Sequence, residues 1–135
     1  MGRNLDLTEF DVRGFKDLPS VEIVYSYVQP SPLVIRALVS GGVRGIVFAG
    51  TGAGLLSSGE AETLNELLDP DPAKRPVLVR SNRTGSGRVV SYPEFDKMGM
   101  IPADTLNPQK ARILLMLALT KSQDLSVISQ MFSEY

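Results

Sequence analysis

Short runs of β-branched and aromatic residues alternate along the chain with longer stretches in which apolar residues recur at helical spacing. The short runs predict strands over residues 21–27, 43–49 and 76–79, and a short fourth strand over residues 98–101. The longer stretches predict four helices: one from residue 32, one from about residue 58, one over residues 108–121 and one after residue 124. This alternation predicts a three-layer α/β domain of flavodoxin or Rossmann type. Its sheet of about four mainly parallel strands carries helices on both faces.

The expected helix ends carry recognisable signals. Pro32 and Pro108 each suit the first position of a helix, and each follows a residue that can cap it, Ser31 or Asn107. Asp124 can cap the last helix. The 108–121 helix is apolar almost all round from residue 113 to residue 119, which predicts burial on several sides.

Composition narrows the possible functions. The chain has 135 residues, enough for one domain with a core that needs no disulfide or metal. Its net charge is −1 without a basic stripe, so nucleic acid is not an expected partner. A membrane is not expected either, because the longest apolar run is far shorter than the ~20 residues of a spanning helix. The polar start of the chain does not resemble a signal peptide.

Cysteine and histidine are both absent. Their absence excludes Cys nucleophiles, Ser-His-Asp arrangements and zinc sites built on Cys or His. A general base would have to be Asp, Glu, Lys or Tyr.

A glycine-rich segment, residues 50–54 (GTGAG), follows an expected strand and precedes an expected helix. Backbone N–H groups at such a place can hold a phosphate. The dinucleotide fingerprint, however, needs glycine where this chain has Leu55, and an acidic residue where it has Arg80 and Ser81. A tight turn between strand and helix is the favoured interpretation.

A polar loop is expected over residues 80–88, with residues 89 and 90 as a short hairpin arm. Its three arginines could hold an anion, but solvated arginines, or arginines paired across an interface, are the favoured interpretation.

Two further groupings could carry chemistry. Glu94 and Asp96 lie beside Tyr92 and Lys97 in an expected loop, where such carboxylates are more often solvated than catalytic. The adjacent pair at residues 120–121 (TK) should point in different directions on its helix. The residues alone therefore show no complete active site.

Several segments resemble, in order, the C-terminal domain of bacterial periplasmic-type L-asparaginases and glutaminase-asparaginases. The longest is LNPQKARILL at residues 106–115. The others are FDV (10–12), IVY (23–25), GIVFAGTG (45–52), VRSNR (79–83), GSGRV (85–89) and FSEY (132–135). The resemblance covers nearly the whole chain and implies a linker remnant over residues 1–20 and a C-terminal domain over residues 21–135.

The resemblance implies a chain that is inactive alone. In the family the threonine nucleophile and its supporting Thr-Lys-Asp set belong to the N-terminal domain, and the C-terminal domain adds polar groups to a neighbouring subunit's site. Two family asparagines correspond here to Ala53 and Leu55. Glu94 matches the family's substrate-binding glutamate if two residues are missing between Asp96 and Lys97.

The resemblance further implies no cofactor, a homo-oligomer, and an N-terminal domain as partner. The compartment stays open between periplasm and cytoplasm. An alternative is a free-standing small-molecule-binding or interaction module on the same scaffold, since Ala53 and Leu55 have lost the polar groups of the family. A third is an asparaginase relative of changed specificity, with a substrate that tolerates Leu55.

Overall fold

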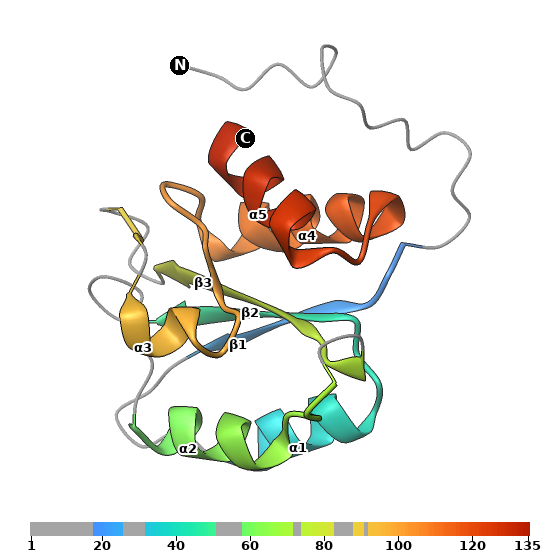
Figure 1. The fold of residues 1–135 in the computed structure, drawn as a ribbon, viewed down its shortest axis with the longest axis vertical. Helices are drawn as coiled ribbons and strands as arrows, with labels where there is room; N and C mark the ends of the chain where they lie inside the picture. Colours follow the sequence, from blue (N-terminus) through green and yellow to red (C-terminus); the bar gives the residue numbers. More distant parts are fainter. Residues whose placement is uncertain (1–17, 26–31, 51–57, 72–73, 83–87, 91) are drawn as a thin grey trace.

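The computed structural model describes residues 18–25, 32–50, 58–71, 74–82, 88–90 and 92–135. Its centre is a four-stranded parallel sheet in the order β1-β2-β3-β4 (Figure 1). The strands are β1 (Val21–Tyr25), β2 (Gly45–Gly50), β3 (Val77–Asn82) and β4 (Ile101–Pro102). The prediction of a mainly parallel α/β sheet is confirmed.

Helices cover both faces of the sheet (Figure 1). One face carries α1 (Pro32–Ser40), α2 (Ser58–Leu67) and the short α3 (Pro93–Asp96); the other carries α4 (Pro108–Lys121) and α5 (Leu125–Glu134). Successive parallel crossovers of one hand place their helices on the same face, which accounts for α1, α2 and α3 lying together.

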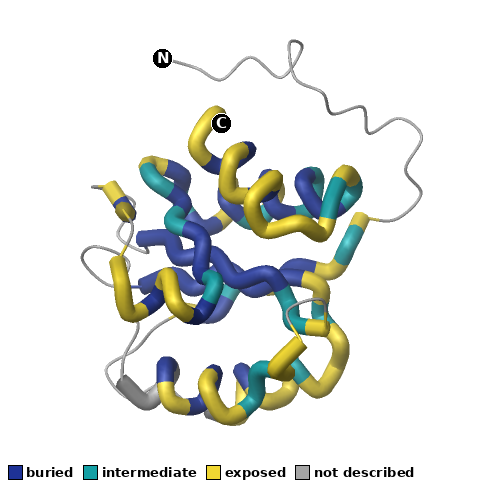
Figure 2. Tube along the Cα trace, in the orientation of Figure 1, coloured by how far each residue is buried: buried dark blue, intermediate teal, exposed yellow. Residues whose placement is uncertain are grey.

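The two faces of the sheet belong to two separate cores because side chains alternate along a strand. In β2, Ile46 and Phe48 pack toward α1 and α2, whereas Val47 packs toward α4. Every residue of β2 and of β3 is buried, and Figure 2 shows these central strands enclosed between the helical layers. Burial on both faces is typical of a parallel sheet and explains the continuous apolar run in β2.

The expected helix caps are confirmed where they can be described. The Asn107 side chain accepts a hydrogen bond from the Lys110 backbone N–H at 2.8 Å, and Asp124 accepts one from Ser126 at 2.9 Å. Beyond α1, Gly42 has φ +74°, a left-handed conformation that glycine adopts without strain. These contacts satisfy helix-terminal groups that would otherwise lack partners.

Two expectations about the strand bounds are wrong. β3 does not end at residue 79 but continues through Asn82, and its last three residues are buried. β4 is Ile101–Pro102 rather than residues 98–101, because Met98 and Met100 lie in the turn after α3 and fill the core under α2. The expected burial of α4 on several sides is confirmed, because the helix packs on the sheet and on α5, although Ile113 is 55% exposed.

Two expected features extend beyond the described residues. Residues 26–27 of the first predicted strand lie outside them, as do residues 1–17 of the predicted linker. Residues 18–20 carry no helix or strand, but the carbonyl of Ser20 accepts hydrogen bonds from Arg44 and Gly45 at 2.9 and 3.1 Å. These bonds join the start of β1 to the start of β2.

Candidate functional site

The carboxyl end of a parallel sheet is where α/β domains usually bind ligands, often where the strand order reverses. The described strands follow one another in sequence order, so this sheet contains no such reversal. The glycine-rich turn after β2, with Ala53 and Leu55, lies outside the described residues, as does most of the loop after β3. The described part of this edge consists of the end of β3, residues 88–90 and α3.

Arg80 is the most unusual residue at this edge. It was expected in a solvated loop, but it lies in β3 with no exposed surface. Its Nη2 donates to the carbonyl of Val90, and its guanidinium carbon lies 5.0 Å from the centre of the Phe95 ring. Burial lowers the pKa of Arg80, and the negative charge of Asp96 acts in the opposite direction.

The other polar residues at the end of β3 are also buried. Ser81 faces α4, and its hydroxyl donates to the carbonyl of Leu106 at 2.8 Å. The carbonyl of Arg80 accepts from the Ala103 backbone N–H at 2.9 Å, just beyond β4. A strand can bury polar side chains that are hydrogen-bonded, so the change from apolar to polar at residue 80 did not mark its end.

Glu94 lies on α3, not in a loop, and its side chain is exposed. No hydrogen bond among the described residues joins Glu94 to Asp96, whose Oδ1 accepts from the Tyr92 backbone N–H at 3.3 Å. Glu94 also lines a cavity of about 490 Å³ between α2 and α3, together with Asn65, Leu68, Arg75, Lys97 and Met98. The described geometry therefore gives no shared-proton carboxylate pair, and leaves Glu94 free to meet a group from outside the chain.

The last arginine of the expected anion loop, Arg88, is exposed and paired. Its Nε lies 2.5 Å from Oδ1 of Asp104, and this hydrogen bond raises the pKa of Arg88. Val89 forms an antiparallel bridge with Asp104 through backbone bonds of 2.9 and 3.2 Å. Arg80 and Arg88 thus have separate partners, and the described residues do not form the anion loop that the sequence allowed.

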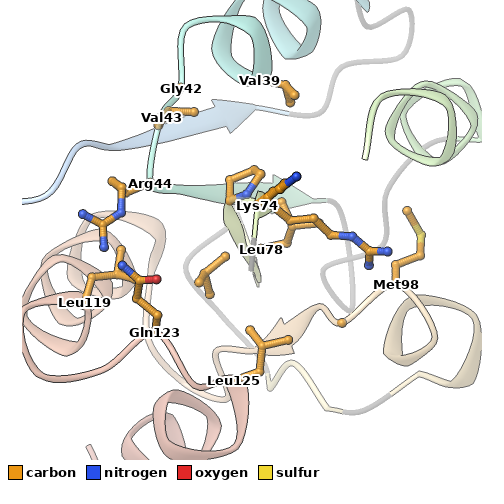
Figure 3. Close-up of a pocket in the computed structure, with 14 residues that line it drawn as sticks. Val39, Gly42, Val43, Arg44, Lys74, Leu78, Met98, Leu119, Gln123 and Leu125 are labelled. Carbon is orange, nitrogen blue, oxygen red and sulfur yellow. The ribbon is translucent and has the colours of Figure 1, made fainter. Parts of the chain in front are cut away.

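A second cavity, of about 250 Å³, lies at the opposite edge of the sheet, near the starts of β2 and β3 (Figure 3). Arg44, Lys74 and Arg75 contribute to its lining, and no acidic residue does. Arg75 is already bonded to the carbonyls of Asp69 and Pro70. This cavity holds positive charge but no group that could act as a nucleophile with a base.

The described part of the chain shows no Thr-Lys pair, metal cluster or membrane-spanning helix. The Thr120 hydroxyl donates to the carbonyl of Leu117, so it is not directed at Lys121. No three His, Cys, Asp or Glu side chains in the described ranges gather to hold a metal ion. Among the same residues, no helix has the length and apolar character needed to cross a bilayer.

Comparison with known proteins gives one family over most of the chain. The family described as the glutaminase/asparaginase C-terminal domain matches residues 20–132. The chain belongs to this family. It is 43% identical over 130 residues to L-asparaginase 2 of Escherichia coli, and 42% identical over 133 residues to the glutaminase-asparaginase of Pseudomonas fluorescens.

A solved structure of a related protein has the same fold. The probable cytoplasmic L-asparaginase of Campylobacter jejuni superposes with a TM-score of 0.84 at 42% identity, over 94% of this chain and 40% of that one. The alignments to the E. coli and P. fluorescens relatives cover 95% of this chain but only 36% and 35% of theirs. The chain therefore spans about a third of the length of the curated relatives that it matches.

Proposed function

We propose that this chain is the C-terminal domain of an L-asparaginase-like amidohydrolase and is inactive without the N-terminal domain. The family's reaction converts asparagine to aspartate and ammonia by acyl transfer to a threonine, which the resemblance places in that other domain. The observation that carries the proposal is the match to nearly all of this chain but only 36% of the E. coli L-asparaginase 2. The lack of a nucleophile–base pair among the described residues supports it.

Glu94 is the residue proposed to contact substrate, by accepting a hydrogen bond from the substrate's amino group across a subunit boundary. Its exposure on α3 supports this role, because a carboxylate that serves a neighbour's site must be accessible. A hydrogen bond to a charged group is worth about 1.5–3 kcal/mol, or roughly a 10- to 150-fold change in affinity. Ala53 and Leu55 cannot supply the family's two asparagine side chains, so substrate preference is expected to differ.

The experiment joins this chain to the N-terminal domain of the E. coli L-asparaginase 2 and measures ammonia release from asparagine and glutamine. Glu94→Gln removes the negative charge and should raise KM at least tenfold with little change in kcat, since the contact binds substrate and transition state alike. Glu62→Gln, an exposed glutamate on α2, is the matched control and should leave KM unchanged. Equal KM values for the Glu94→Gln variant and the parent would contradict the role of Glu94.

Self-association is also proposed, as the family resemblance implies. Leu33 and Val34 are neighbours on α1 and are 73% and 49% exposed. Apolar side chains gathered on a surface commonly mark an interface with a partner domain or subunit. Light scattering at low micromolar concentration should give a mass above that of the monomer, and Leu33→Asp with Val34→Asp should lower it. A monomer before any substitution would refute self-association.

A further inference from the structure

The buried guanidinium of Arg80 has more hydrogen-bonding capacity than the described structure uses. Nη2 donates to Val90, but Nε and Nη1 are buried without a hydrogen-bond partner among the described residues. No ion pair among the described residues includes Arg80, and Asp96 acts on it only through its charge. A buried charge with unmet donors is costly, and an apolar residue of similar size would often give equal or greater stability.

Arg80 contacts two residues that come later in the chain, Val90 and Phe95. Its Nη2 bonds to the carbonyl of Val90, before α3 begins. Its guanidinium lies over the Phe95 ring, inside α3, with 5.0 Å between guanidinium carbon and ring centre. Attraction between a cation and an aromatic face is stronger when both are removed from water, as they are here.

The direction of Glu94 depends on the same contacts. Neighbouring residues on a helix are turned by about 100° from each other, because a helical turn takes 3.6 residues. Phe95 is 4% exposed and is held under α3, so Glu94 must point away from the core. With only four residues, α3 is too short to keep this orientation without such an anchor.

We propose that Arg80 is a positioning residue: it fixes the turn of α3 through Val90 and Phe95, and so sets the direction in which Glu94 meets the substrate. This inference rests on the proposed contact between Glu94 and the substrate's amino group. Arg80 itself touches no substrate, because it has no exposed surface. Its effect on catalysis is therefore indirect.

A double-mutant cycle tests this dependence in the enzyme formed with the N-terminal domain. Arg80→Met should raise KM about tenfold with kcat nearly unchanged, and should have little effect when Glu94→Gln is already present. Arg80→Lys, which keeps the positive charge but lacks the planar guanidinium, should give an intermediate KM. Phe95→Leu removes the ring and should raise KM in the same direction. Arg36→Met, at an exposed arginine paired with Glu66, is the matched control.

The outcomes separate the two proposals. An equal rise in KM from Arg80→Met with and without Glu94→Gln overturns positioning through Glu94. Positioning through Glu94 is also overturned if Arg80→Met leaves KM unchanged while Glu94→Gln alone raises it. If Glu94→Gln itself leaves KM unchanged, the proposed contact of Glu94 is refuted, and any role of Arg80 through it falls too.

Backbone hydrogen exchange on this chain provides a readout that does not depend on activity. The amides of Phe95 and Asp96 bond to the carbonyl of Tyr92 at 3.0 and 2.8 Å. Arg80→Met should speed their exchange about tenfold or more, while the amides of α4 keep their rates. A uniform change across both helices, or none in α3, would show that Arg80 does not hold this turn. Arg80→Lys is the fallback if Arg80→Met fails to fold.

Discussion

Replacing Gly45 by alanine tests how closely α4 approaches the sheet. Gly45 is the first residue of β2, and it is buried between Val21 of β1 and Leu115 of α4. A Cβ added there would lie 2.6 Å from Leu115 Cδ2 and 3.2 Å from Val21 Cγ2. Both neighbours are 0% exposed, so neither side chain has solvent-filled space into which it could move.

Two opposing effects decide whether Gly45→Ala raises or lowers the free energy of unfolding. Replacing glycine by alanine in extended backbone lowers the entropy of the unfolded chain and favours folding by about 0.4–1 kcal/mol. Forcing an extra methyl group into a packed core costs about 1–3 kcal/mol. The clash should win, and Gly45→Ala should lower the free energy of unfolding by about 1–2 kcal/mol. A domain of this size would then lose about 4 °C in melting temperature per kcal/mol.

Urea denaturation of four proteins supplies the test: the parent chain, Gly45→Ala, Leu115→Ala, and the double variant. Leu115→Ala alone should cost about 2–5 kcal/mol because it empties a buried site. In its presence the clash is gone, so Gly45→Ala should become neutral or stabilising. A Gly45→Ala variant that is as stable as the parent chain, or equally destabilised in both backgrounds, would refute this packing of α4 on β2.

Two further predictions concern helix caps. Asn107→Ala removes the acceptor of the Lys110 N–H bond and should lower the free energy of unfolding by about 1 kcal/mol. Asn107→Asp keeps an acceptor and should change it by only a few tenths of a kcal/mol. Thermal melts compare the two variants, and equal losses of stability would contradict the cap. Hydrogen bonds from the side chain and backbone of Ser126 lower the pKa of Asp124 in the folded protein. The ionised Asp124 side chain therefore stabilises the fold fully above the ordinary aspartate pKa of about 3.9, and this stabilisation is lost as the pH falls through the lower pKa of the folded state. Asp124→Asn should remove this loss below about pH 4, measured by urea midpoints across pH; parallel pH profiles for the variant and the parent chain would count against it.

The sequence was a good guide to the fold wherever one periodicity dominated. The apolar run at residues 46–49 predicted a buried strand, and the Asn107–Pro108 and Asp124 signals placed two helix starts correctly. The caps are local interactions between residues three or fewer apart, so the sequence contains all the information needed to find them. The family resemblance added the domain's identity, which periodicity alone could not supply.

The candidate site was harder to predict because it depends on contacts far apart along the chain. Arg80 is buried because Val90 and Phe95 meet it from a later segment, and nothing near residue 80 in the sequence signals those partners. Ser81 is similarly satisfied by Leu106, 25 residues away. The polar residues 80–82 therefore suggested a loop, although the backbone there continues as β3. The substrate-binding role of Glu94 came only from the family resemblance, and it stays a prediction.

Ammonia release from asparagine by the purified chain is the most direct test of the central claim. We expect no turnover by this chain alone, and activity once it is joined to the N-terminal domain of an asparaginase relative. Sustained turnover by the chain alone would contradict it, as long as that turnover is lost on substitution of one of its own residues.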